Sequence, residues 1–320
     1  MSGPLTLDGF CHRLAADRLR YRKLHPAAMA GEFVDYFDVP PFPRMKEITG
    51  LFDWAEIGRV VLSHETGGLR GYHVGTRDGG YLIHVDASEG RVGQEHTALH
   101  EAYEVVRERL HDLHPRIGLP TGPPLCRQAD RFAAATLMQP HWFAIFAEAS
   151  GLDVVALQAS YGRSYASLTM RLAEVMRHQP LLAVLYERGP QDEPLPGMDG
   201  QASDGLRATV VTRTPGFRLR TQRRPLSVLR SLLPRRGEPP TLGSVAERVA
   251  LTGTPAAVER VSGYDLWRAD DLAVLARPVI WGGEVAKVSV IAVPYRDRSV
   301  LLPQFANAAF ERISHAHQVL

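Results

Sequence analysis

The stretch that decides the fold of the first half of the chain is His96-Thr-Ala-Leu-His100-Glu101-Ala-Tyr-Glu104. From Gln94 to about His111 the pattern predicts a helix, because apolar side chains recur at spacings of four, three and four residues. That stripe is formed by Leu99, Tyr103, Val106 and Leu110.

The polar side chains of this helix have the spacing of a metal site. Two ligands four residues apart lie about one turn apart on one face, so they can reach the same ion. His100 is the candidate first ligand and Glu104 the second, in a position where a zinc-peptidase helix usually carries histidine. Glu101 is placed to act as the general base that takes a proton from metal-bound water.

Two questions stay open from the residues alone. His96 precedes His100 by one turn, but the row from His96 to Glu104 spans about 12 Å, so only adjacent pairs could share an ion. The alternative is an ordinary amphipathic helix whose polar face carries histidine and glutamate, with Glu101 a solvated charge.

Working outward, the first half alternates helices and strands. Before the signature we expect helices over 8–24 and 45–55, separated by a proline-rich turn at 39–43, then strands over 59–63, 69–74 and 81–85, the last two forming a hairpin. After it we expect a helix over 125–138 ended by Pro140, and a helical pair over 153–161 and 164–178 with Asp153 and Ser164 as N-caps.

The second half has a different character. A segment rich in Pro, Gly, Asp and Ser over 189–205 is the expected linker. Beyond a strand over 181–186 and this linker, we expect strands over 207–211, 217–221, 272–276 and 285–293, with Pro278 in the segment joining the last two, and helices over 226–233, 242–251 and 306–318. The predicted fold class is α+β in both halves.

The order of parts resembles the ImmA/IrrE metallopeptidases over roughly residues 30–180. The hairpin, the His100-Glu101 helix, and the motif Ala129-Asp130-Arg-Phe132-Ala-Ala-Ala-Thr-Leu137-Met138-Gln-Pro140 follow in the family's order. The helix-turn-helix-like pair ending near Arg171-Leu172 follows in turn. The resemblance implies a zincin-like domain, and zinc as cofactor.

This resemblance implies a ligand set of His100, Glu104 and Cys126, with Glu101 as the catalytic base. Two positions depart from the family, because Glu104 replaces its second histidine and Cys126 replaces its third ligand, a glutamate. Thiolate is a good zinc ligand, and the alternative for Cys126 is a small buried residue of a core helix. An active enzyme would be a zinc-dependent endopeptidase that cleaves a partner, such as a transcriptional repressor.

Residues 272–291, with two strands around Trp281-Gly-Gly283, resemble the GAF-like domain of the radiation-response members of that family. The predicted domains are 1–150, peptidase-like; 151–188, helix-turn-helix-like; 189–205, linker; and 206–320, a GAF-like sensor. The rival interpretation is a non-catalytic stress-response regulator that binds a small molecule, a protein or DNA.

Composition excludes little. The 320 residues carry a formal net charge of +2 and two cysteines, too few for a disulfide framework, which favours a reducing cytoplasm. We expect no signal peptide and no membrane span. Gly205–Gly237 contains no acidic residue and nine arginines, so this stretch could bind DNA, an anionic ligand or an acidic partner, with Arg218, Arg220, Arg223 and Arg224 as candidates.

Overall fold

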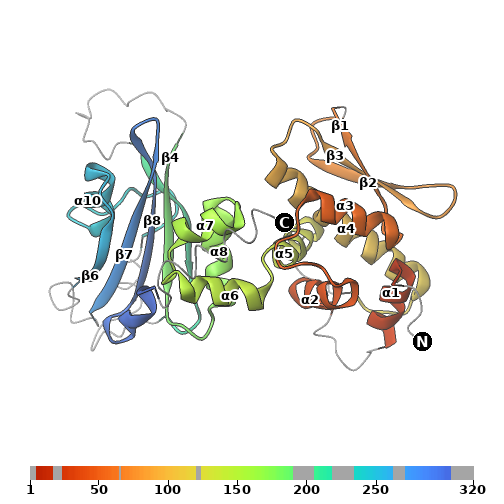
Figure 1. Ribbon diagram of the computed structural model, residues 1–320, viewed down its shortest axis with the longest axis horizontal. Coiled ribbons are helices and arrows are strands. Elements are labelled where there is room, and N and C mark those ends of the chain that lie inside the picture. The colour runs from red at the N-terminus through yellow and green to blue at the C-terminus, as the bar shows by residue number, and fades with distance from the viewer. Residues whose placement is uncertain are drawn as a thin grey trace. The chain divides into compact units, whose positions relative to one another are not determined.

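The computed structural model describes residues 5–16, 24–64, 66–119, 124–189, 205–217, 234–261 and 271–303 (Figure 1). Contacts divide the chain into two compact units, Met1–Trp142 and Phe143–Leu320. Both units combine helices with a sheet, so the α+β class is confirmed. None of the described helices is both long enough and apolar enough to cross a membrane.

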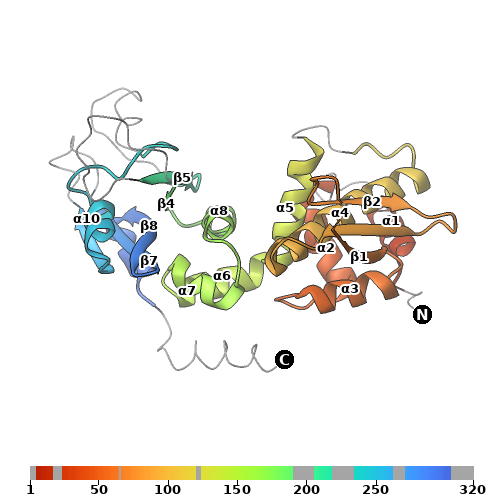
Figure 2. The same cartoon turned by 90° about the horizontal axis from the view of Figure 1, so that it is seen from above.

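The first unit is a three-stranded sheet packed on helices. Its helices are α1 (Leu7–Ala16), α2 (Pro26–Phe37), α3 (Met45–Trp54), α4 (Arg91–Leu113) and α5 (Leu125–Leu137), and its strands are β1 (Arg59–Ser63), β2 (Gly71–Gly75) and β3 (Tyr81–Asp86). The strand order is β1-β3-β2, with β1 parallel and β2 antiparallel to β3. Helix α4 packs against β2 and β3 on one side and against α1, α3 and α5 elsewhere, as Figure 2 also shows.

The predicted elements around the signature are confirmed, including the hairpin and the break after α5. Helix α2 was missed, although Pro26 at its first turn is a recognised helix-start signal. Of the predicted helix over 8–24, the structure shows Leu7–Ala16 as α1, and residues 17–23 lie outside the described residues.

The second unit is built on one antiparallel sheet of order β5-β4-β8-β7-β6. Its strands are β4 (Leu182–Arg188), β5 (Leu206–Arg213), β6 (Ala256–Val261), β7 (Leu272–Trp281) and β8 (Glu284–Pro294). Its helices are α6 (Pro140–Ala149), which begins in the first unit, α7 (Val154–Tyr161), α8 (Tyr165–Val175), α10 (Val245–Thr252) and the 3-10 segment η2 (Tyr295–Leu301). Helix α10 covers one side of the sheet and α8 packs against β4 and β5 on the other (Figure 1).

Two features of this sheet correct the sequence analysis. Pro278, expected between two strands, lies within β7, and the edge strand β6 was not predicted. Helix α6, outside the sheet, was not predicted either. Proline is tolerated there because β6 pairs with β7 only as far as Ala276, so the missing N–H of Pro278 faces no partner strand. The predicted elements over 217–221, 226–233 and 306–318 lie wholly or almost wholly outside the described residues, as does most of the linker.

The helical pair is present with its expected caps, since Asp153 accepts from the Val155 N–H and Ser164 from the Ser167 N–H. The observed division differs from the predicted domains, because the residues from Phe143 through this pair group with the second unit. Strand β4, which follows the pair, is hydrogen-bonded between β5 and β8. The segment 151–188 is therefore part of that sheet domain.

Candidate functional site

The site begins with a close approach between β2 and α4. A Cβ added at Gly71 would lie 2.4 Å from Thr97 Cγ2 and 2.8 Å from the His84 carbonyl oxygen. Only glycine therefore lets β2 lie this near the helix. His73, two residues further along the strand, points to the same face and reaches the polar side of α4.

His73 joins two carboxylates of α4. Its Nδ1 lies 3.0 Å from Glu101 Oε2 and its Nε2 lies 3.2 Å from Glu108 Oε2. The hydrogen bond to Glu101 raises the pKa of His73, against the effect of burial, and Glu108 adds to the rise. A protonated imidazole can donate to both carboxylates, so Glu101, only 6% exposed, is held in a defined orientation.

His100 is held on its other side by α5. Its Nδ1 lies 3.0 Å from Asp130 Oδ1, and its Nε2 lies 3.6 Å from Glu104 Oε1. Burial lowers the pKa of His100, but the hydrogen bonds to Asp130 and Glu104 outweigh it and raise the value to about 9. The hydrogen bond with His100 lowers the pKa of Asp130. His96 lies at the edge of this cluster, with Nε2 4.0 Å from Asp130.

The predicted residues are only partly brought together. His100, Glu101 and Glu104 share one side of α4, whereas Cys126 is exposed on the first turn of α5. Within the part of the chain that is described, the group of three or more potential ligands whose atoms all lie within 4.8 Å of one another is His73, Glu101 and Glu104. Cys126 is not in it, so its role as a ligand stays a prediction. Arg218, Arg220, Arg223 and Arg224 lie outside the described residues.

Sequence reasoning missed His73 and Asp130 as members of the site. Asp130 stands inside a motif that was recognised, but its partner His100 lies 30 residues earlier in the chain. His73 is 28 residues from Glu101, and a strand pattern does not say which helix its side chains meet.

The donor types fit a divalent cation of borderline hardness such as zinc, which accepts imidazole and carboxylate ligands. One arrangement uses His73, Glu101 and Glu104. The other uses His100 and Glu104, with Asp130 on the second ring nitrogen of His100 as the outer carboxylate that commonly orients a ligating histidine. The two arrangements share Glu104 and differ in whether Glu101 remains available as a base.

Two arginines of the helix-turn-helix-like pair are buried, whereas Arg177 just after α8 is exposed. Arg171 of α8 is 4% exposed and pairs with Glu174 at 3.1 Å, and Arg163 just before the helix is 4% exposed. Buried guanidinium groups are not available to phosphates, so neither Arg163 nor Arg171 is a candidate for DNA contact.

Comparisons with known proteins give a fold likeness. No protein-family model and no curated protein matches the chain. Among solved structures, a Mycobacterium tuberculosis transcriptional regulator is similar with a TM-score of 0.50 and 12% sequence identity, covering 92% of this chain and 83% of that one. At that identity the likeness concerns the fold.

Proposed function

We propose that this chain is a regulatory metallopeptidase-like protein, in which the polar side of α4 binds zinc and acts on a peptide bond of a protein partner. The observation that carries the proposal is His100, held at Nδ1 by Asp130 with Nε2 3.6 Å from Glu104. That is the arrangement expected of a ligating imidazole with an orienting carboxylate behind it and a carboxylate ligand beside it.

Each side chain then has a role. His100 and Glu104 would hold the ion, Asp130 would orient His100, and Glu101 would accept the proton of the attacking water and return it to the leaving amine. The hydrogen bond from His73 occupies Oε2 of Glu101, which leaves Oε1 for the water. Zinc, when bound, would polarise the scissile carbonyl and lower the pKa of its water. Cys126 is retained as the proposed third protein ligand.

A regulatory role has separate support. The similar solved structure is that of a transcriptional regulator, and it is matched over most of both chains. A transcriptional repressor is the partner that the ImmA/IrrE resemblance implies, and residues 206–320, which belong to the second unit, are the proposed sensor domain.

A second candidate function is a non-catalytic regulator that binds a ligand, a protein or DNA. The observation that favours it is that each of two imidazoles lies within ion-pair distance of two carboxylates. His73 lies between Glu101 and Glu108, and His100 lies between Asp130 and Glu104. Protons on these two imidazoles can balance the carboxylates of a site that never takes up metal.

Zinc content decides between the two. We expect about one zinc per chain after zinc is supplied and the excess removed, with the zinc lost in His100→Ala and Glu104→Ala. His96→Ala is the matched control, since it removes a histidine from the same helix outside the proposed pair. Elemental analysis of the folded variants measures the result.

The outcomes separate the alternatives. No zinc in the unchanged protein would reject the metallopeptidase proposal. Zinc lost in His73→Ala but kept in His100→Ala would place the ion on His73, Glu101 and Glu104, and would remove Glu101 as a free base. If zinc follows His100, then Glu101→Gln should retain the metal while abolishing cleavage of a peptide library measured by mass spectrometry.

A further inference from the structure

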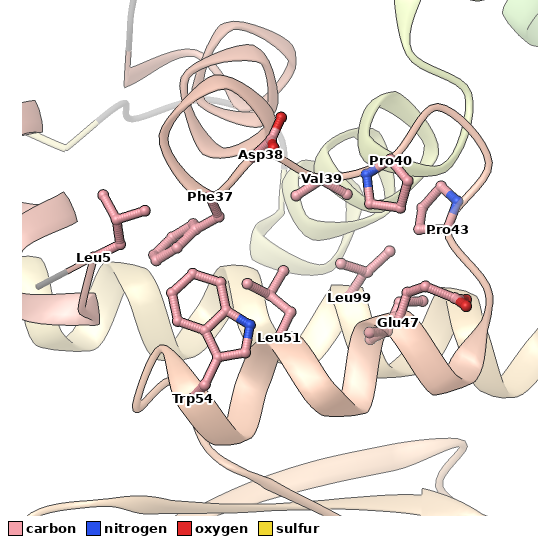
Figure 3. Close-up of a pocket in the computed structure, with 11 residues that line it drawn as sticks. Leu5, Phe37, Asp38, Val39, Pro40, Pro43, Glu47, Leu51, Trp54 and Leu99 are labelled. Carbon is pink, nitrogen blue, oxygen red and sulfur yellow. The ribbon is translucent and has the colours of Figure 1, made fainter.

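The first unit contains a pocket that the proposed function does not use. A pocket of about 340 Å³ lies among α2, the loop after it, α3 and α4 (Figure 3). Its floor is apolar, formed by the buried side chains Phe37, Ile48, Leu51 and Leu99. A volume of this size falls in the range of small-molecule sites.

One end of the pocket exposes large apolar groups to water. Trp54 is 51% exposed and Leu5 is 38% exposed, and both line the pocket. Trp54 packs edge-to-face on Phe37, with ring centroids 6.0 Å apart, so its position is fixed by an aromatic neighbour. In Figure 3 the rings of Phe37 and Trp54 lie close together on the side of Leu5. A ligand that covered this end would remove apolar surface from water.

The charge of the pocket has one sign. Its lining includes two charged side chains, the exposed carboxylates Asp38 and Glu47, and no cation. Glu47 Oε2 accepts a hydrogen bond from the Arg44 N–H at 2.9 Å, and no described residue forms an ion pair with Asp38.

The surrounding sequence extends this bias. Residues 32–56 hold six acidic and two basic side chains, a balance of −4, whereas the whole chain carries +2. The segment that supplies most of the pocket lining is therefore net negative, although Glu32 within it is paired with Arg13.

We propose that this pocket binds a small amphipathic organic cation. Its apolar chain or ring would lie against Phe37, Leu51 and Leu99, and its ammonium group would lie near the carboxylate of Asp38, with Glu47 adding negative charge on another side of the pocket (Figure 3). An anionic amphiphile of the same length would meet the same apolar floor but a repulsive mouth, so charge provides the selectivity.

Isothermal titration calorimetry with three probes of equal chain length tests the proposal. Octyltrimethylammonium, below the concentration at which it forms micelles, should bind saturably at one site per chain. Octanol should bind about three- to fivefold more weakly and octanoate more weakly still, since an exposed charge interaction contributes up to about 1 kcal/mol and fivefold corresponds to about that value.

Variants locate the site. The double change Asp38→Asn and Glu47→Gln keeps the shape of both side chains, and Gln still offers an oxygen to the Arg44 N–H. It should weaken binding of the ammonium probe about three- to fivefold. Asp53→Asn is the matched control, because it removes an exposed acid from α3 that does not line the pocket, and it should leave binding almost unchanged.

Three results would overturn the proposal. These are the absence of saturable ammonium binding, equal binding of octanoate or octanol, and unchanged binding in a double variant whose thermal unfolding matches that of the unchanged protein. None of these depends on whether α4 binds zinc, so the outcome is independent of the proposed function.

Discussion

The two sides of α4 are held in place by different forces. On one side, Glu101 is hydrogen-bonded to His73 and Glu104 forms an ion pair with His100. On the other side, Leu99 is 1% exposed and lines the apolar pocket with α2 and α3. One side therefore carries titratable chemistry, and the other carries packing.

The difference matters because the two kinds of contact stabilise to different degrees. A partly exposed ion pair contributes about 0–1 kcal/mol, whereas a buried leucine contributes several times as much. The direction in which the carboxylates of α4 point is therefore determined mainly by the apolar side. A single helix can carry a costly cluster of charges when its opposite side is well packed.

The largest expected effect is on the apolar side. Leu99→Ala removes a buried side chain and should lower the free energy of unfolding by about 3 kcal/mol. Urea denaturation monitored by circular dichroism measures it. Leu62→Ala on β1 is the control, since Leu62 is 52% exposed and its loss should change the free energy by less than about 0.5 kcal/mol. Equal effects of the two variants would mean that the apolar side does not hold the helix.

Local patterns predicted much of this comparison from the sequence. The four-three-four spacing of apolar residues gave the stripe of α4, and the four-residue spacing of His100 and Glu104 placed them side by side. Helix caps were equally local, since Asp153 and Ser164 bond to N–H groups two or three residues ahead. Contacts of this range follow from helix geometry alone.

The other members of the site and of the pocket could be found only from the tertiary fold. His73 and Asp130 reach α4 from a strand and from another helix, and the pocket draws its lining from segments between Leu5 and Leu99. The exposure of Cys126 depends on where the first turn of α5 lies in the unit, which helical periodicity does not state. The members of the site that were missed are those that meet it across long stretches of chain.

The next effect tests the close approach that brings His73 to the polar side. Gly71→Ala introduces a Cβ 2.4 Å from Thr97 Cγ2, so β2 must move away from α4, at a cost of about 2 kcal/mol. Gly75→Ala is the matched control on the same strand, because a Cβ there meets nothing within 4 Å. Urea denaturation of both variants gives the difference in stability. Nuclear magnetic resonance titration of His73 should show its pKa falling towards the ordinary value in Gly71→Ala only.

If the two glycine variants proved equally stable, the strand would have room to move without loss. The position of His73 would then not depend on Gly71. In that case the hydrogen bond to Glu101 would have to be maintained by β3, the other neighbour of β2.

The smallest effect concerns the polar side and its dependence on pH. In metal-free protein the folded state raises the pKa of His100 from 6.5 to about 9, because hydrogen bonds to Asp130 and Glu104 outweigh burial. The stabilisation is therefore fully present below pH 6.5 and is lost as the pH rises through about 9. His100→Ala should cost about 1 kcal/mol near pH 6 and much less above pH 9.

Denaturation of both proteins across this pH range, after treatment with a chelator, measures the difference. His141→Ala, which replaces an exposed histidine of α6, serves as the control. A difference that grew as the pH rose would mean that burial, which favours the neutral imidazole, outweighs the two carboxylates. The polar side of α4 would then hold His100 as a neutral ring, ready to bind a metal without first releasing a proton.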